Sequence, residues 1–207
     1  MVAIIDYGVG NLFSLKSSFS AIGADAIVTS DPEVIRGADK IILPGVGAFE
    51  DAAKKLASSG LGAVLTEEAK KGKHILGICL GMQLLFEKSF EYGEHEGLGL
   101  VKGEVRAISE VIPPEYKIPH IGWNSLSFGN EKHELFKYLS EGDFVYFVHS
   151  FYATKCENSV IATAEYGAPL TAAVASGNVM GCQFHPEKSG SAGLSILRAF
   201  LEIGETK

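Results

Sequence analysis

In His74-Ile75-Leu76-Gly77-Ile78-Cys79-Leu80-Gly81-Met82-Gln83-Leu84-Leu85-Phe86, a buried strand is followed by a glycine-framed turn and the apolar start of a helix. The Gly-x-Cys-x-Gly pattern is the cysteine form of the strand–turn–helix elbow that exposes a nucleophile above a sheet. Gly77 and Gly81 permit the sharp bend, and the helix N-terminus favours an anion, so the pattern indicates a reactive thiolate at Cys79. Alternatively, Cys79 is one more small buried hydrophobic residue. Taken alone, the elbow does not separate the two interpretations.

On the N-terminal side of this stretch, short apolar runs alternate with amphipathic segments, which is typical of a parallel sheet wound with helices. We expect strands at 2–6, 26–29, 40–43 and 75–78, and helices after the capping residues Asn11 and Asp31 and over 48–58 and 62–71. Beyond Gly93, strand-like runs follow one another at 98–101, 104–108, 144–148, 160–164, 171–175 and 179–184, before a last helix over 192–203. The sequence therefore predicts an α/β fold with a mixed, mainly parallel central sheet flanked by helices and extended by antiparallel strands.

The length and apolar content fit one domain. The chain has 207 residues, of which 46% are hydrophobic, and it contains no linker or low-complexity tract, so we expect a single domain over 1–207. No apolar run reaches the roughly 18 residues of a membrane span, and no basic leader precedes the first strand. We therefore expect a cytoplasmic protein without a membrane partner.

Charge and cysteine usage exclude further classes. A net charge of −7 argues against binding nucleic acid, because that affinity comes mainly from lysine and arginine. Cys79, Cys156 and Cys182 are widely spaced without a Cys-x-x-Cys pair, which argues against a disulfide framework and against a zinc site. The glycine-rich phosphate-binding motifs do not occur either. We expect no metal and no cofactor.

A cysteine nucleophile needs a base, and the base needs an orienting acceptor. Among the six histidines, His185 is the best candidate, because Phe184-His185-Pro186-Glu187-Lys188-Ser189 directly follows a strand. Glu187 can accept from the second ring nitrogen and fix the tautomer. An exposed turn without a role is the alternative. His149 could compete as the base, but its apolar neighbours favour a strand residue with a structural hydrogen bond.

Acyl transfer also requires donors for the developing oxyanion. Pro44-Gly45-Val46-Gly47, at the end of the third predicted strand, can present backbone N–H groups. In elbow enzymes, the residue after the nucleophile, here Leu80, supplies another. Alternatively, these glycines make a tight turn or hold a phosphate.

Together, Pro-Gly-Val-Gly, Gly-Ile-Cys-Leu-Gly-Met-Gln and His-Pro-Glu-Lys-Ser, in this order, resemble the class I (triad-type) glutamine amidotransferases with their flavodoxin-like architecture. The resemblance covers essentially the whole chain. Within the class, Asp6-Tyr7-Gly8-Val9-Gly10-Asn11-Leu12, Val46 and Pro119-His120-Ile121-Gly122-Trp123-Asn124 are similar to the glutaminase subunits of imidazole glycerol phosphate synthases, which serve histidine biosynthesis.

The resemblance implies a mechanism and a set of residues. Cys79 would attack the side-chain amide of glutamine, His185 would act as general base and then general acid, and Glu187 would orient His185. The positions that hold the substrate or its oxyanion would be Gly45, Val46, Gly47, Leu80, Gln83, Ser150 and Phe151. A γ-glutamyl thioester would form, and water would release glutamate.

A partner is implied as well. Ammonia would pass to a (β/α)₈-barrel cyclase subunit, which makes imidazole glycerol phosphate and an aminoimidazole carboxamide ribotide. Asn11, Trp123, Tyr146 and Lys188 match positions at or beside the interface with that barrel. The free subunit would be a poor glutaminase, with Val46 at the switch, because a β-branched residue resists the positive φ values that help a peptide to flip.

Three other functions remain open from the sequence. The partner could be a different synthase, of GMP, anthranilate or pyridoxal phosphate. The elbow could serve a cysteine peptidase or a γ-glutamyl hydrolase that acts alone. The chain could also be an inert flavodoxin-like binding module.

Overall fold

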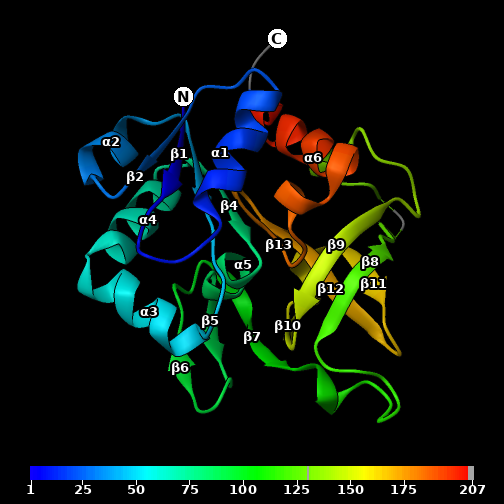
Figure 1. Ribbon diagram of the computed structural model, residues 1–207. Helices are drawn as coiled ribbons and strands as arrows, with labels where there is room; N and C mark the ends of the chain where they lie inside the picture. The colour runs from blue at the N-terminus through cyan, green and yellow to red at the C-terminus, as the bar shows by residue number, and fades with distance from the viewer. Residues whose placement is uncertain (130, 205–207) are drawn as a thin grey trace.

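A seven-stranded sheet forms the centre of the molecule (Figure 1). The computed structural model describes residues 1–129 and 131–204. Strands β13, β4, β3, β1 and β2 lie in this order and run parallel, and β12 and β11 extend the β13 edge in antiparallel fashion. Their bounds are β1 (Val2–Ile5), β2 (Ala26–Thr29), β3 (Lys40–Leu43), β4 (His74–Ile78), β11 (Val160–Glu165), β12 (Pro169–Ser176) and β13 (Val179–Cys182).

Helices cover both faces of this sheet because its parallel strands are apolar on both sides. In β1, Ile4 packs toward one face with residues of α1 and α6, whereas Ala3 and Ile5 pack toward the other with residues of α2, α3 and α4. Figure 1 shows α1 beside α6, with α3 and α4 on the opposite side. The bounds are α1 (Leu12–Ala21), α2 (Pro32–Gly37), α3 (Phe49–Ser58), α4 (Leu61–Lys70), α5 (Leu80–Leu84) and α6 (Gly190–Glu202).

Two smaller sheets are added to this core. One is four-stranded, in the order β10-β7-β5-β6, and the other is a two-stranded ribbon of β8 and β9. Their bounds are β5 (Phe86–Ser89), β6 (His95–Glu96), β7 (Val101–Ala107), β8 (His120–Ser125), β9 (Phe144–His149) and β10 (Phe151–Thr154). Short 3₁₀ turns are η1 (Ile108–Glu110), η2 (Glu134–Phe136), η3 (Glu157–Ser159) and η4 (Pro186–Lys188).

The predicted fold class is confirmed: the main sheet is mixed, mostly parallel and flanked by helices. The predicted strand at 98–101 is wrong except for Val101, because the N–H groups of Leu98 and Leu100 bond to carbonyls at the end of α5 and just after it. The helix after the elbow is also shorter than its apolar run indicates, since Phe86 already begins β5. Strands β5, β6, β8 and β10 were not predicted.

At the amino ends of the parallel strands, the buried ammonium of Lys40 binds the carbonyl groups at the C-terminus of α6. Its Nζ donates to the carbonyls of Phe200 at 2.9 Å and Ile203 at 2.7 Å, and also to that of Leu201. These carbonyls belong to the last turn of the helix, where no intrahelical donor is available. Within the described residues, no helix is long and apolar enough to cross a membrane.

Candidate active site

Cys79 lies in the bend between β4 and α5, as the elbow pattern predicts. Its backbone has φ 54° and ψ −113°, a conformation that is unfavourable for a residue with a Cβ atom. The bend is held because the Cys79 N–H donates to the carbonyl of Cys182 at 2.8 Å and the Cys79 carbonyl accepts from Gln83 at 3.1 Å. The side chain is 7% exposed. The backbone therefore stores strain at the residue predicted to be the nucleophile.

The elbow glycines are required by close packing of backbones and not by positive φ values. A Cβ atom on Gly77 would lie 2.7 Å from the carbonyl oxygen of Gly81, and one on Gly81 would collide with the Leu43 carbonyl. A Cβ atom on Gly45 would lie 2.5 Å from the amide nitrogen of Gly81. Gly45 thus brings the segment after β3 against the start of α5.

His185 and Glu187 form a buried pair beside Cys79. The ring Nδ1 of His185 donates to Oε1 of Glu187 at 2.8 Å, which fixes the ring and leaves Nε2 for another partner. Strand β9 supports the pair, because the Tyr146 carbonyl accepts from the His185 N–H at 2.9 Å. The Tyr146 N–H in turn donates to the Ser189 hydroxyl at 3.0 Å. Nε2 of His185 and Oε2 of Glu187 are buried with no hydrogen bond from any described residue.

The environment of His185 favours the protonated ring. Burial alone would lower the pKa of His185, but the Cys79 sulphur and the Glu187 carboxylate together raise it to about 9. The sulphur is close enough to exert this effect, although it does not meet the geometry of a hydrogen bond to Nε2. The pair can therefore exchange a proton once small adjustments bring the two atoms together.

The predicted substrate residues converge on one cavity of about 320 Å³. Of these, only Gly45 lies outside the lining, where it supports the elbow. Cys79 and His185 line the same cavity. Its lining consists of Val46, Gly47, Cys79, Leu80, Gln83, Glu91, Tyr92, Pro119, Val148, His149, Ser150, Phe151, His185 and Lys188.

The segment after β3 is anchored by Tyr7, which was not among the predicted site residues. The hydroxyl of Tyr7 donates to the carbonyl of Pro44 at 2.6 Å. Burial, and secondarily Cys79, raise the pKa of Tyr7 well above its usual value, so this hydroxyl remains a donor. Gly47 follows with φ 93°, a conformation that glycine adopts readily. Val46, between them, is 39% exposed.

Two of the four predicted interface residues lie on the outer face of the β8–β9 ribbon, and a third, Lys188 of η4, lies beside them. Trp123 and Tyr146 are opposite one another in the ribbon, with ring centroids 6.1 Å apart. Nζ of Lys188 lies 5.8 Å from the centroid of the Tyr146 ring. Asn11 lies on a different element, where its side chain accepts from the Ser14 N–H and caps α1.

Gln83 was predicted from the sequence, but its partner Gln183 and the lining residue Glu91 were not, because their contacts join distant parts of the chain. Gln83 Nε2 donates to the side-chain oxygen of Gln183 at 3.0 Å and to the carbonyl of Phe151 at 3.2 Å. Glu91 accepts from the Phe49 N–H at 2.6 Å, and burial raises the pKa of Glu91. In the sequence, Glu91 belongs to none of the motifs, and only its negative charge could have marked it as a candidate for the site.

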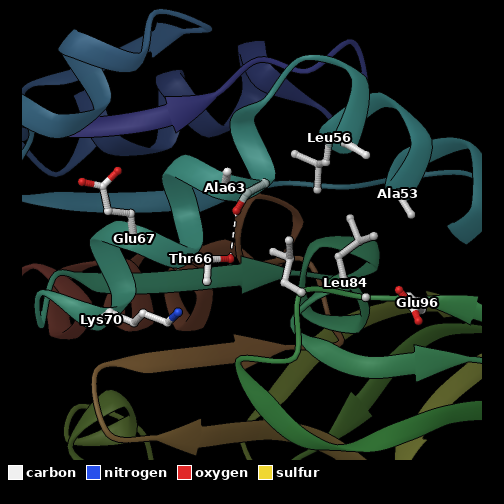
Figure 2. A pocket seen from close by; sticks show the side chains of 12 residues that line it. Ala53, Leu56, Ala63, Thr66, Glu67, Lys70, Leu84 and Glu96 are labelled. Atoms are coloured by element: carbon white, nitrogen blue, oxygen red, sulfur yellow. Dashed lines mark hydrogen bonds between the residues drawn. The ribbon is translucent and has the colours of Figure 1, made fainter.

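A larger cavity, of about 590 Å³, lies elsewhere, between α3, α4 and residues 96–98 (Figure 2). Its wall is mainly apolar, with Leu56 and Leu84 facing the space and the charged groups of Glu67 and Lys70 toward one side. The lining contains no cysteine, serine or histidine, so this cavity lacks the cysteine–histidine combination of the smaller one. Among the described residues, no group of three or more histidine, cysteine, aspartate or glutamate side chains could hold a metal ion.

Comparisons with known proteins agree with the resemblance. The model of the family "Glutamine amidotransferase class-I" matches residues 3–203. The curated imidazole glycerol phosphate synthase subunit HisH of Oceanobacillus iheyensis is 48% identical, covering 98% of this chain and 99% of the relative. The HisH subunit of Aquifex aeolicus is 49% identical, covering 98% and 96%.

Solved structures share the fold at low identity. A crystal structure described as a glutamine amidotransferase superposes with a TM-score of 0.75 at 20% identity, covering 98% of each chain. A PurLQS structure from Thermotoga maritima gives 0.73 at 21%, covering 99% and 98%. The matches in sequence over nearly the full length go further than the fold: the chain belongs to the class I glutamine amidotransferase family and, within it, to the HisH subunits of imidazole glycerol phosphate synthase.

Proposed function

We propose that the cavity at Cys79 hydrolyses glutamine to glutamate and ammonia through a Cys79–His185–Glu187 triad. The observation that carries the proposal is the strained cysteine beside a buried histidine whose Nδ1 is bonded to a buried carboxylate. The proposed fate of the ammonia, transfer to a cyclase partner, follows from the HisH relatives. We also propose that the chain acts as one amidotransferase domain, since both large hydrophobic clusters include strands of the central sheet.

The geometry supports acyl transfer in two steps. Sγ of Cys79 attacks the side-chain carbonyl carbon of glutamine, and backbone N–H groups of Leu80 and of the Val46–Gly47 segment receive the oxyanion. Nε2 of His185 gives its proton to the departing nitrogen. Ammonia leaves, and a γ-glutamyl thioester remains on Cys79. Neutral His185 then takes a proton from water and the hydroxide attacks the thioester, so that glutamate leaves and the Cys79 thiolate and protonated His185 are restored.

The remaining lining residues suit the amino-acid part of the substrate. Glu91 brings a carboxylate into the cavity, which complements an α-ammonium group. Ser150 and Phe151 form one wall of the cavity and offer polar backbone groups. Gln83 stiffens that wall through its bond to the Phe151 carbonyl. These roles give the cavity its preference for a free amino acid over a peptide.

The proposed partner is a (β/α)₈-barrel cyclase that binds the outer face of the ribbon. Ile121 and Phe144 are each 57% exposed, and Trp123 is 55% exposed, all pointing away from the main sheet. Exposed aromatic residues of this kind anchor protein interfaces. Lys188 lines the cavity and also contacts the ribbon through Tyr146, so the interface and the ammonia source adjoin.

The test is covalent labelling with the glutamine analogue 6-diazo-5-oxo-L-norleucine, read by intact and peptide mass spectrometry. We expect one adduct, on Cys79, that is lost in Cys79→Ala and retained in the matched variant Cys156→Ala. Faster labelling and glutamate release with the cyclase than alone would support the partner. An unlabelled Cys79 in the presence of the cyclase, or an adduct on another cysteine, would contradict the proposal.

A further inference from the structure

Two histidines that the proposed chemistry does not use are buried side by side in the ribbon. His120 of β8 and His149 of β9 are directly opposite one another, and Nδ1 of His120 lies 3.0 Å from Nε2 of His149. His120 also stacks between the rings of Phe147 and Tyr166, with centroid separations of 4.8 Å and 4.1 Å. Such enclosed polar groups require a complete set of partners.

The partners determine where each proton lies. Nδ1 of His149 is 2.8 Å from the Phe151 carbonyl, which can only accept, so this nitrogen carries the hydrogen. Nε2 of the neutral His149 ring must therefore accept from Nδ1 of His120. Nε2 of His120 in turn accepts from Nδ2 of Asn124, at 3.3 Å. Burial lowers the pKa of both histidines to about 4, which keeps both rings neutral at pH 7.

The chain of bonds continues into the cavity. The Phe151 carbonyl also accepts from Gln83, whose side chain is bonded to Gln183. Nε2 of Gln183 lies 3.7 Å from Sγ of Cys79. An uninterrupted series of hydrogen bonds, through side chains and the backbone carbonyl of Phe151, therefore links Asn124 in the ribbon to the sulphur at the elbow.

We propose that His120 and Asn124 are positioning residues that act through His149 to hold the Ser150–Phe151 wall of the glutamine cavity. The inference rests on the proposed function, because it assigns both residues to the same cavity. Trp123, next to Asn124, points to the outer face of the ribbon. Strand β8 therefore carries a residue of the exposed surface beside a residue of the bond series that reaches the cavity wall.

A spectroscopic test does not depend on activity. Long-range ¹H–¹⁵N spectra of the histidine rings in the full chain should place both His120 and His149 in the neutral Nδ1–H form at pH 7. The variant His120→Phe retains an aromatic ring in the stack but removes the donor to His149. Its spectrum should lack one Nδ1–H ring and should shift the Nε2 signal of His149. An Nε2–H form for either ring in the unchanged protein would overturn the proposal.

The kinetic test uses the complex with the cyclase. His120→Phe should raise the KM for glutamine about tenfold and leave kcat within about twofold, because the wall holds the amino-acid part and not the reacting amide. His133→Phe, which removes a histidine that caps η2, is the matched control and should leave KM unchanged. An unchanged KM in His120→Phe with Cys79 still labelled would refute this inference alone, whereas loss of labelling in the unchanged protein would refute the proposed function.

Discussion

The two ends of the parallel strands treat buried polar groups in opposite ways. At the amino ends, the Lys40 ammonium is surrounded by helix carbonyls that accept its protons. At the carboxyl ends, Nε2 of His185 and Oε2 of Glu187 are buried without a hydrogen bond from a described residue. Burying a polar atom without a partner is unfavourable, so such atoms are rare in folded proteins. The amino end is thus organised for stability, and the carboxyl end keeps reactive atoms free.

The largest expected effect comes from Glu187→Gln at the carboxyl end. The amide can no longer stabilise an imidazolium or fix the tautomer of His185, so glutaminase turnover should fall by about 10³–10⁴-fold. The free energy of unfolding, from urea denaturation at pH 9.5, should change by less than about 1 kcal/mol, because His185 is then mostly neutral and the amide oxygen can still accept from its Nδ1. The exposed Glu157→Gln is the control. A large loss of stability with full turnover would reverse the contrast between the two ends.

The converse change is Lys40→Met at the amino end. The last carbonyls of α6 would lose their donor in a buried setting, and we expect the free energy of unfolding to fall by about 2–4 kcal/mol. Turnover of the folded protein should stay within about twofold, since Lys40 lies at the opposite ends of the strands from Cys79. Lys16→Met, on the exposed side of α1, should change neither quantity. Unaltered stability in Lys40→Met would refute the assigned role.

The charge state of His185 makes stability depend on pH. Its pKa rises from about 6.5 to about 9 on folding, so the protonated ring stabilises the folded state fully below pH 6.5. That contribution is lost as the pH rises through about 9, and its upper limit is about 3 kcal/mol. Urea denaturation from pH 6 to 9.5 should show a steeper decline for the unchanged protein than for His185→Gln. Parallel profiles would contradict the raised pKa.

Local patterns in the sequence predicted the parts of the fold that local chemistry determines. The apolar runs of β1, β3 and β4, the capping residues of α1 and α2, and the elbow at Cys79 each depend on neighbouring residues. Strand β9 was predicted at 144–148, but β8 was missed because it contains Gly122 and three polar residues, and because its partner strand begins only at Phe144. Its pairing is visible only in three dimensions.

The same distinction applies to the candidate site. Cys79 and the His185–Glu187 pair stand out because each lies in a short motif at the end of a strand. The bond between Gln83 and Gln183, the clamp of Tyr7 on Pro44 and the histidine pair of the ribbon join distant positions. No spacing rule in one sequence identifies such contacts, because strand order and register decide which side chains meet.

Val46→Gly should give the smallest change in turnover and stability. It would sharpen most the contrast between the two ends of the parallel strands. The Val46 side chain is 39% exposed, so its removal should lower the free energy of unfolding by only about 0.5–1 kcal/mol, mainly through added backbone freedom. Glycine admits the positive φ values that a β-branched residue resists, so the peptide could turn its N–H into the cavity more easily. We expect unstimulated glutamate release to rise about three- to tenfold, equivalent to about 0.7–1.4 kcal/mol of barrier. Val111→Gly, at an exposed valine outside the cavity, is the matched control. If release did not rise, the restraint on Cys79 would have to lie elsewhere at the carboxyl end, with Nε2 of His185, which has no hydrogen bond from a described residue, as the next group to examine.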